Sequence, residues 1–158
     1  MIEGVRLALP TDLDVLENFA AEAVHEQTEN RGGTIWSKRD TRNPPYRASL
    51  ESVFNNPDEE IWIGLIDDVP VGYAVAAVEM LRTGETLGII SDIWIEPQAR
   101  EVGVGEELIN VIIRWCTERN CIGIDSMALP GNRATKNFFE TFGFKARLLT
   151  VHRPLNSE

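Results

Sequence analysis

The sequence predicts a single α+β domain, residues 1–158, in which helices cover both faces of a central sheet. Its length fits one domain. A run of strands in the middle of the chain is apolar at nearly every position, which is typical of strands buried on both faces. The last third of the chain instead alternates helical and strand periodicity.

The N-terminal third begins with a strand and an amphipathic helix. Apolar and polar residues alternate over Val5–Leu9, which predicts a short strand. Apolar residues recur at helical spacing over residues 12–27, which predicts a helix. Residues 28–45 have no period and contain glycine and proline breakers, so we expect a loop there, followed by a short helix over Tyr46–Phe54.

The remaining elements follow from the same periodicities. Five further strands are expected, at Ile61–Ile66, Val71–Met80, Leu87–Ile95, Ile122–Met127 and Phe144–His152. Two helices are expected among the last three of these strands, over residues 104–119 and 132–142. Residues 28–47, which include Trp36, are either an acceptor-recognition loop or a plain connection.

The charge and the chain start limit the function classes. A net charge of −10 argues against non-specific binding to nucleic acid or anionic membranes, and suits a cationic substrate such as an amine. The start Met1-Ile2-Glu3 is acidic, and the longest apolar stretch is too short for a bilayer, so a cytoplasmic protein is expected. Two cysteines without metal or redox spacing predict reduced thiols and no metal site.

A glycine-containing loop at Arg100–Gly105 is the strongest candidate for chemistry. A buried strand turns there into a helix, whose first amides have no intrahelical partner and form an anion site. Glycines at 103 and 105 remove Cβ atoms that would keep a phosphate away, and Arg100 adds positive charge. Alternatively, the glycines only ease a tight turn. A dinucleotide motif fits poorly because Leu108 stands at its third glycine, and a Walker A loop is absent.

Three segments, in the right order, resemble the GCN5-related N-acetyltransferase (GNAT) family. Arg100-x-x-Gly103-x-Gly105 is similar to the family's acyl-CoA motif after its fourth strand. Asn132 through Phe139 to Gly143 is similar to its common Asn…Phe-Tyr-Glu-Lys-x-Gly-Phe ending. The opening, with Arg6 and Asp12, is similar to its Arg-x-Ala-x-x-x-Asp start.

The resemblance implies a mixed, mostly antiparallel sheet of six to seven strands that splays between the fourth and fifth. It implies acetyl-CoA as cosubstrate, with the pantetheine arm along the fourth strand at Ile93, Trp94 and Ile95. Its pyrophosphate would meet the amides of Glu101, Val102, Gly103, Val104, Gly105 and Glu106. Asn132 would contact the pantetheine arm, and Phe139 would line the thioester pocket.

The implied activity is acetyl transfer to a primary amine of a small molecule, peptide or protein, by direct attack in a ternary complex. A backbone N–H near Ile93 would hold the oxyanion. The candidate bases are Asp92 and Glu79, because an unpaired acid in the centre of an apolar strand is costly. Either acid is alternatively a structural partner for an arginine or a backbone amide.

Two positions depart from the family pattern. Glu101 stands where many members have glycine, and its carboxylate weakens pyrophosphate binding unless it is solvated. Phe139 replaces the tyrosine that commonly protonates the leaving thiolate, and this favours an alternative function as a non-catalytic acyl-CoA sensor. The apolar edge of Phe144–His152 leaves a homodimer as an open expectation.

Overall fold

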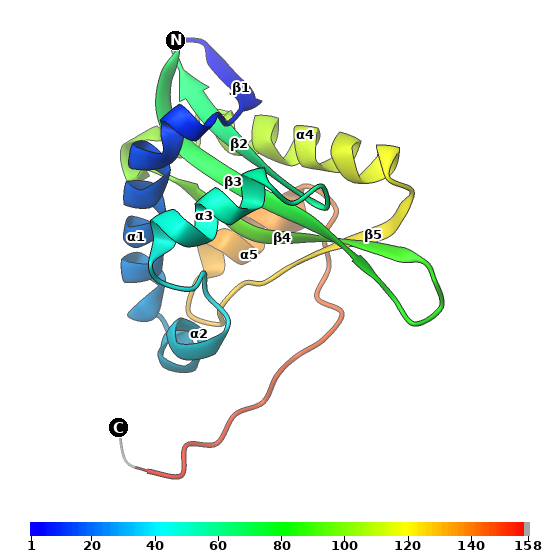
Figure 1. The fold of residues 1–158 in the computed structure, drawn as a ribbon. Helices are drawn as coiled ribbons and strands as arrows, with labels where there is room; N and C mark the ends of the chain where they lie inside the picture. The colour runs from blue at the N-terminus through cyan, green and yellow to red at the C-terminus, as the bar shows by residue number, and fades with distance from the viewer. Residues whose placement is uncertain (157–158) are drawn as a thin grey trace.

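A computed structural model describes residues 1–156 and contains one five-stranded sheet (Figure 1). The strands lie in chain order: β1 (Glu3–Leu7), β2 (Glu59–Ile66), β3 (Val69–Met80), β4 (Thr86–Ile95) and β5 (Cys121–Ser126). The first four pair antiparallel, and β5 pairs parallel with β4. The mixed, mostly antiparallel sheet is therefore confirmed, whereas the predicted count of six to seven strands is wrong for the described residues.

Helices cover both faces of the sheet, as predicted. They are α1 (Leu13–Thr28), α2 (Gly33–Arg39), α3 (Tyr46–Phe54), α4 (Val104–Glu118) and α5 (Arg133–Thr141). Helices α1 and α3 pack on one face, and α4 and α5 on the other. No helix within residues 1–156 is long and apolar enough to cross a membrane.

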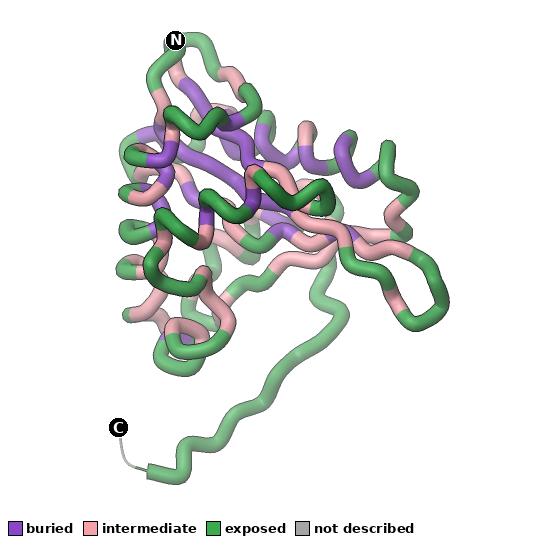
Figure 2. The backbone as a smooth tube through the Cα atoms, in the orientation of Figure 1, coloured by how far each residue is buried: buried purple, intermediate pink, exposed green. Residues whose placement is uncertain are grey.

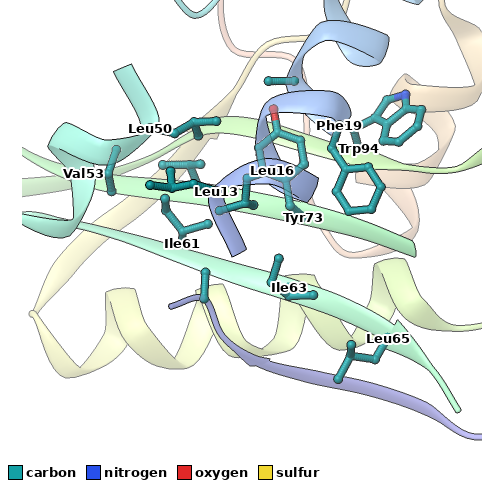
Figure 3. Close-up of a cluster of buried hydrophobic side chains, with 13 residues drawn as sticks. Leu13, Leu16, Phe19, Leu50, Val53, Ile61, Ile63, Leu65, Tyr73 and Trp94 are labelled. Atoms are coloured by element: carbon teal, nitrogen blue, oxygen red, sulfur yellow. The ribbon is translucent and has the colours of Figure 1, made fainter. Parts of the chain in front are cut away.

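The two faces have separate cores. On the α1 face, the buried residues include Leu16, Phe19 and Tyr73, with Trp94 at one end (Figure 3). Residues from α4 dominate the other core, where Leu108 and Ile112 are fully buried. Successive side chains of a strand point to opposite faces, so β4 contributes Trp94 to the first core and its two neighbours to the second.

Helix α2 lies inside the segment for which a loop was expected. Its sequence has no helical period, but its first residue, Gly33, packs against the end of α1. A Cβ atom at Gly33 would come within 2.4 Å of the carbonyl oxygens of Gln27 and Thr28. This close tertiary contact, rather than amphipathic patterning, sets the start of the helix.

The strand expected at Phe144–His152 does not form. Residues 145–156 run away from the folded body as an extended, exposed segment (Figures 1 and 2). A strand is stable only when it pairs with another strand, and among the described residues no strand pairs with this segment, although Arg147 Nε donates to Asp125 Oδ1 on β5 at 2.8 Å. The expectation failed because periodicity does not specify the pairing partner.

Candidate functional site

Strands β4 and β5 separate partway along their length. Their parallel pairing extends only to Ile90 and Ser126, while β4 continues to Ile95. The Glu96 N–H donates to Val71 O on β3, so the alternation of the strand directs the backbone groups of Ile95 and Ile93 toward the opening. These groups form a strand edge that β5 does not cover, called the free strand edge below, and an extended ligand arm can add to it by hydrogen bonding.

The N-terminus of α4 lies directly after this free edge. Gly103 caps the helix in the left-handed region at φ +97°, and Glu101 is also left-handed at φ +67°. The first helical bond runs from the Glu107 N–H to Gly103 O at 3.1 Å. Within residues 1–156, no amide from Glu101 to Glu106 donates a backbone hydrogen bond. These amides are therefore free to bind an anion.

Glycine is needed at the two positions of the loop, 103 and 105, for different structural reasons. Gly103 provides the left-handed cap, and a Cβ atom there would lie 3.3 Å from Glu3 Oε1. At Gly105, a Cβ atom would come within 2.6 Å of Phe138 Cε1 on α5. Gly105 is therefore required for the packing of α4 against α5.

Arg100 points back toward β4. Its Nε donates to Ile95 O at 2.8 Å, and its terminal nitrogen pairs with Glu26 Oε2 at 2.8 Å. The guanidinium also lies 5.9 Å from the ring centroid of Trp94. Arg100 thus closes the end of the free strand edge.

Glu26, which the sequence reasoning missed, joins α1 to this group. Its Oε2 also accepts from Trp94 Nε1 at 2.9 Å. The Arg100 hydrogen bond lowers the pKa of Glu26, with a smaller contribution from Trp94 and with burial opposing. The sequence does contain a pattern that indicates Glu26. Glu26 continues the inward-facing stripe of α1 that contains Phe19 and Ala23, where a charged residue is unusual.

Asn132 begins α5 and contacts α1. Its Oδ1 accepts from the Thr135 N–H at 3.0 Å, which caps the helix. Its Nδ2 donates to Gln27 Oε1 at 3.1 Å, and Asn30 Nδ2 donates to the same oxygen. The ends of α1 and α5 therefore meet beside the separation of β4 and β5.

Residues 19–144 match the sequence pattern of the acetyltransferase (GNAT) family. The chain belongs to this family. No functionally curated protein matches the chain.

Solved structures of acetyltransferases share the fold of this GNAT chain. The aminoglycoside N-acetyltransferase AAC(6')-Iy, in complex with a bisubstrate analogue, has a TM-score of 0.76 at 17% identity, covering 99% of this chain and 100% of that one. An aminoglycoside acetyltransferase from an uncultured soil metagenomic sample, in complex with sisomicin, has a TM-score of 0.66 at 15% identity, covering 99% and 97%. A predicted acetyltransferase from Clostridium acetobutylicum, with acetyl-CoA, has a TM-score of 0.72 at 16% identity, covering 96% of each chain. At these identities the likeness concerns the fold.

In this GNAT chain, Asp92 is held by three donors. Arg42 Nε donates to Asp92 Oδ2 at 2.9 Å, and Arg42 NH2 donates to Oδ1 at 2.6 Å. The Tyr73 hydroxyl donates to Oδ2 at 2.7 Å. Arg42 also donates to Ser49, so Asp92 ties the segment after α2 to the sheet. This arrangement matches the alternative reading of Asp92 as a partner for an arginine.

Glu79, the other candidate base, does not contact Asp92 or the residues that bond to it. It is exposed near the end of β3 and pairs across the sheet with Leu87, whereas the free part of β4 begins beyond Ile90. The structure therefore does not bring Glu79 to the opening that involves Ile93 and Ile95.

Phe139 is buried in the α4 face core, packed against Phe138 and Phe144. Tyr73 lies on the other face of the sheet, and burial, followed by the charge of Asp92, raises its pKa well above the ordinary value. Tyr73 is therefore a poor proton donor. Cys116 is likewise unreactive, because burial raises the pKa of its thiol to about 12.

Proposed function

We propose that this protein transfers the acetyl group of acetyl-CoA to a primary amine. The observation that carries the proposal is the edge of β4 at Ile93–Ile95, which β5 does not pair with, together with the amides at the start of α4, which donate no backbone hydrogen bond. The edge suits the amides of a pantetheine arm, and the helix N-terminus suits a pyrophosphate. Membership of an acetyltransferase family supports the same ligand.

The cationic amine first loses a proton to water, and the neutral amine then attacks the thioester carbonyl directly in a ternary complex. The developing oxyanion accepts a hydrogen bond from a backbone N–H near Ile93. The C–S bond of the tetrahedral intermediate then breaks, and the proton that the attacking nitrogen loses passes through water to the leaving sulfur. A thiol of pKa about 8.5 needs no strong acid for this step at neutral pH. Phe139 then serves as a wall of the thioester pocket rather than as an acid.

The acceptor is a cationic amine of a small molecule or peptide, and Glu26 receives it. Glu26 is ionised at neutral pH, since the Arg100 hydrogen bond lowers the pKa of a carboxyl group that ordinarily titrates well below pH 7, and Arg100 and Trp94 fix its position beside the free strand edge. The net charge of −10 attracts cations. Two of the similar structures are named aminoglycoside acetyltransferases, and aminoglycosides are amines of this kind.

A second candidate function is a non-catalytic acyl-CoA sensor. Phe139 favours it, because the hydroxyl that commonly protonates the thiolate is missing. Tyr73 does not replace that hydroxyl, since its proton is donated to Asp92 on the opposite face of the sheet.

Calorimetry with acetyl-CoA, followed by a free-thiol assay against a panel of amines, tests the proposal. Gly103→Glu places a carboxylate at the anion site and should abolish binding. Gly84→Glu is the matched control, because Gly84 is also left-handed at φ +89° but has no neighbour within 4 Å, in the β3–β4 hairpin. The control should bind like the wild type.

Each outcome decides between the candidates. Amine-dependent thiol release by the wild type establishes an acetyltransferase. Binding without thiol release on any amine leaves the sensor function. Wild-type protein that does not bind acetyl-CoA contradicts both.

A further inference from the structure

Glu3, at the start of β1, lies against the N-terminus of α4. A Cβ atom built on Gly103 would be 3.3 Å from Glu3 Oε1, 3.5 Å from Glu3 Cγ and 3.6 Å from Glu3 Cδ. The end of the Glu3 side chain therefore lies beside the residue that caps the helix. This is the same helix start whose amides are free to bind an anion.

The sheet fixes the position of Glu3. Glu3 pairs with Ile66 of β2, and just before it the N–H groups of Ile2 and Asp67 donate to Asp67 Oδ1 and Ile2 O, both at 2.8 Å. Alternate side chains of a strand share a face, and Val5 packs against the core on the α4 face. Glu3 therefore points toward α4 and is held there by strand pairing.

The Glu3 carboxylate has no cationic partner within residues 1–156. None of the ion pairs of these residues includes it. None of their backbone amides donates to it either, so it lies beside the anion site without occupying it. Its negative charge is compensated only by the positive end of the α4 dipole, which is also what attracts a ligand anion.

The side chains of the loop do not offset this charge. The acidic residues of the loop and of the first turn of α4 are exposed: Glu101, Glu106 and Glu107. Arg100, the one basic residue of the loop, turns back to Ile95 O and to Glu26. A pyrophosphate at this helix start meets free backbone amides, but the loop turns no cationic side chain toward it.

We infer that Glu3 sets the affinity of this protein for acetyl-CoA, by placing a carboxylate beside the amides that receive the pyrophosphate. The inference rests on the acetyl-CoA binding proposed above. Bringing the pyrophosphate to α4 brings like charges close together, and this repulsion weakens binding. Glu3 acts through its charge and touches no reacting atom, so it determines affinity and is not a catalytic residue.

The repulsion acts equally on the cosubstrate and on the product. Acetyl-CoA and CoA carry the same pyrophosphate, so Glu3 raises the KM for acetyl-CoA and the inhibition constant of CoA by the same factor. It therefore favours the release of CoA after each transfer. Removing the charge should give tighter binding together with stronger product inhibition.

Calorimetry of Glu3→Gln with acetyl-CoA tests the inference. The variant should lower the Kd by about threefold to tenfold at low ionic strength, and added salt should reduce this gain. Glu51→Gln is the matched control, because it removes the same charge from an exposed glutamate on α3, which packs on the opposite face of the sheet. It should bind acetyl-CoA like the wild type. S-acetyl-pantetheine, which lacks the pyrophosphate, should bind all three proteins equally.

Equal acetyl-CoA affinities for Glu3→Gln and the wild type would overturn the inference and leave the proposed function intact. An equal gain in Glu51→Gln, or an equal gain for S-acetyl-pantetheine, would also overturn it, because the effect would then not depend on charge at the helix start. A wild type that does not bind acetyl-CoA contradicts the proposed function instead. Inorganic pyrophosphate then decides the inference: tighter binding by Glu3→Gln supports it, and unchanged or absent binding overturns it.

Discussion

Arg42 and Asp92 form a buried ion pair, and each side chain is only 9% exposed. Asp92 was the leading candidate base by its place in β4, but three hydrogen bonds occupy its two oxygens. We therefore propose that Asp92 holds the segment after α2 against the sheet. We propose that Glu26 contacts the acceptor, because Trp94 and Arg100 both donate to its Oε2 and no donor within residues 1–156 bonds its Oε1.

Removing one partner of this pair should be strongly destabilising. Arg42→Met leaves the Asp92 carboxylate buried without its cation, and we expect a loss of about 3–5 kcal/mol in the free energy of unfolding. Combining it with Asp92→Asn removes the buried charge and should recover much of that loss. Equilibrium urea unfolding measures both variants. If Arg42→Met alone lowers the free energy of unfolding by less than about 1 kcal/mol, water solvates the Asp92 carboxylate.

Glu26→Gln tests the acceptor site. The amide retains an oxygen for Trp94 and Arg100 but removes the negative charge, so the KM for a cationic amine should rise about tenfold or more. Acetyl-CoA affinity should stay within about twofold, because the phosphate contacts are backbone amides. Glu22→Gln, an exposed position one turn earlier in α1, is the control. Equal KM values for the three proteins would remove Glu26 from the acceptor site.

Elements with strong periodicity could be predicted, and elements set by tertiary contact could not. Helix α1 and strands β2 to β4 lie close to their predicted bounds because their apolar spacing is unambiguous. Helix α2 depends on Gly33 fitting against α1, and the partner of Phe144–His152 is not encoded in its own pattern. At the site, the free strand edge and the glycine loop could be predicted from local sequence. The Glu26–Arg100 contact could not, because it joins residues 74 positions apart.

Strand β2 and helix α4 approach so closely that only glycine fits between them. A Cβ atom at Gly64 would lie 2.6 Å from Val104 Cγ1. Gly64→Ala should therefore lower the free energy of unfolding by about 1–3 kcal/mol through overpacking. Adding Val104→Ala relieves the clash and makes the two changes non-additive. Gly4→Ala in β1 is the control, since nothing lies within 4 Å of its Cβ position. Urea unfolding that shows no difference between the alanine variants would contradict this packing.

The start of α1 gives the fold a defined acid sensitivity. Asp12 pairs with Arg6 at 2.8 Å and accepts from the Leu9 N–H at 2.7 Å. The Arg6 hydrogen bond, with a smaller contribution from Leu9, lowers the pKa of Asp12 below its model-peptide value of 3.8. The stabilisation is therefore complete above about pH 4 and is lost as pH falls through the folded-state pKa.

Asp12→Asn should consequently be less stable than the wild type at pH 7, and this difference should shrink below pH 4. Thermal unfolding across pH 2.5–7 measures it. Asp14→Asn, at a side chain that is 90% exposed, controls for the loss of an acid in the same turn. A stability difference that stays constant across this pH range would assign the effect to something other than the Asp12 charge.

At the scale of the whole molecule, β4 lies between the core on the α1 face and the core on the α4 face, and the two faces contain different parts of the proposed site. The α1 face contains Glu26 and Trp94, where we place the acceptor, and the α4 face contains the phosphate loop and Phe139. In the proposed reaction, the acetyl group would reach the acceptor through the opening where β4 and β5 separate. A cosubstrate in that opening would contact α4, β4 and α5 at once, so its binding should stabilise the entire fold.

Acetyl-CoA at 100 times its Kd should therefore add about 2.7 kcal/mol to the free energy of unfolding. For a chain of 158 residues this corresponds to a rise in Tm of roughly 5–10 °C. Differential scanning fluorimetry measures the shift, and Gly103→Glu should show none while Gly84→Glu shows the full rise. A shift of equal size in all three proteins would mean that the ligand binds away from the N-terminus of α4. Inorganic pyrophosphate alone should give a smaller rise, because it fills the helix N-terminus but leaves the edge of β4 unpaired.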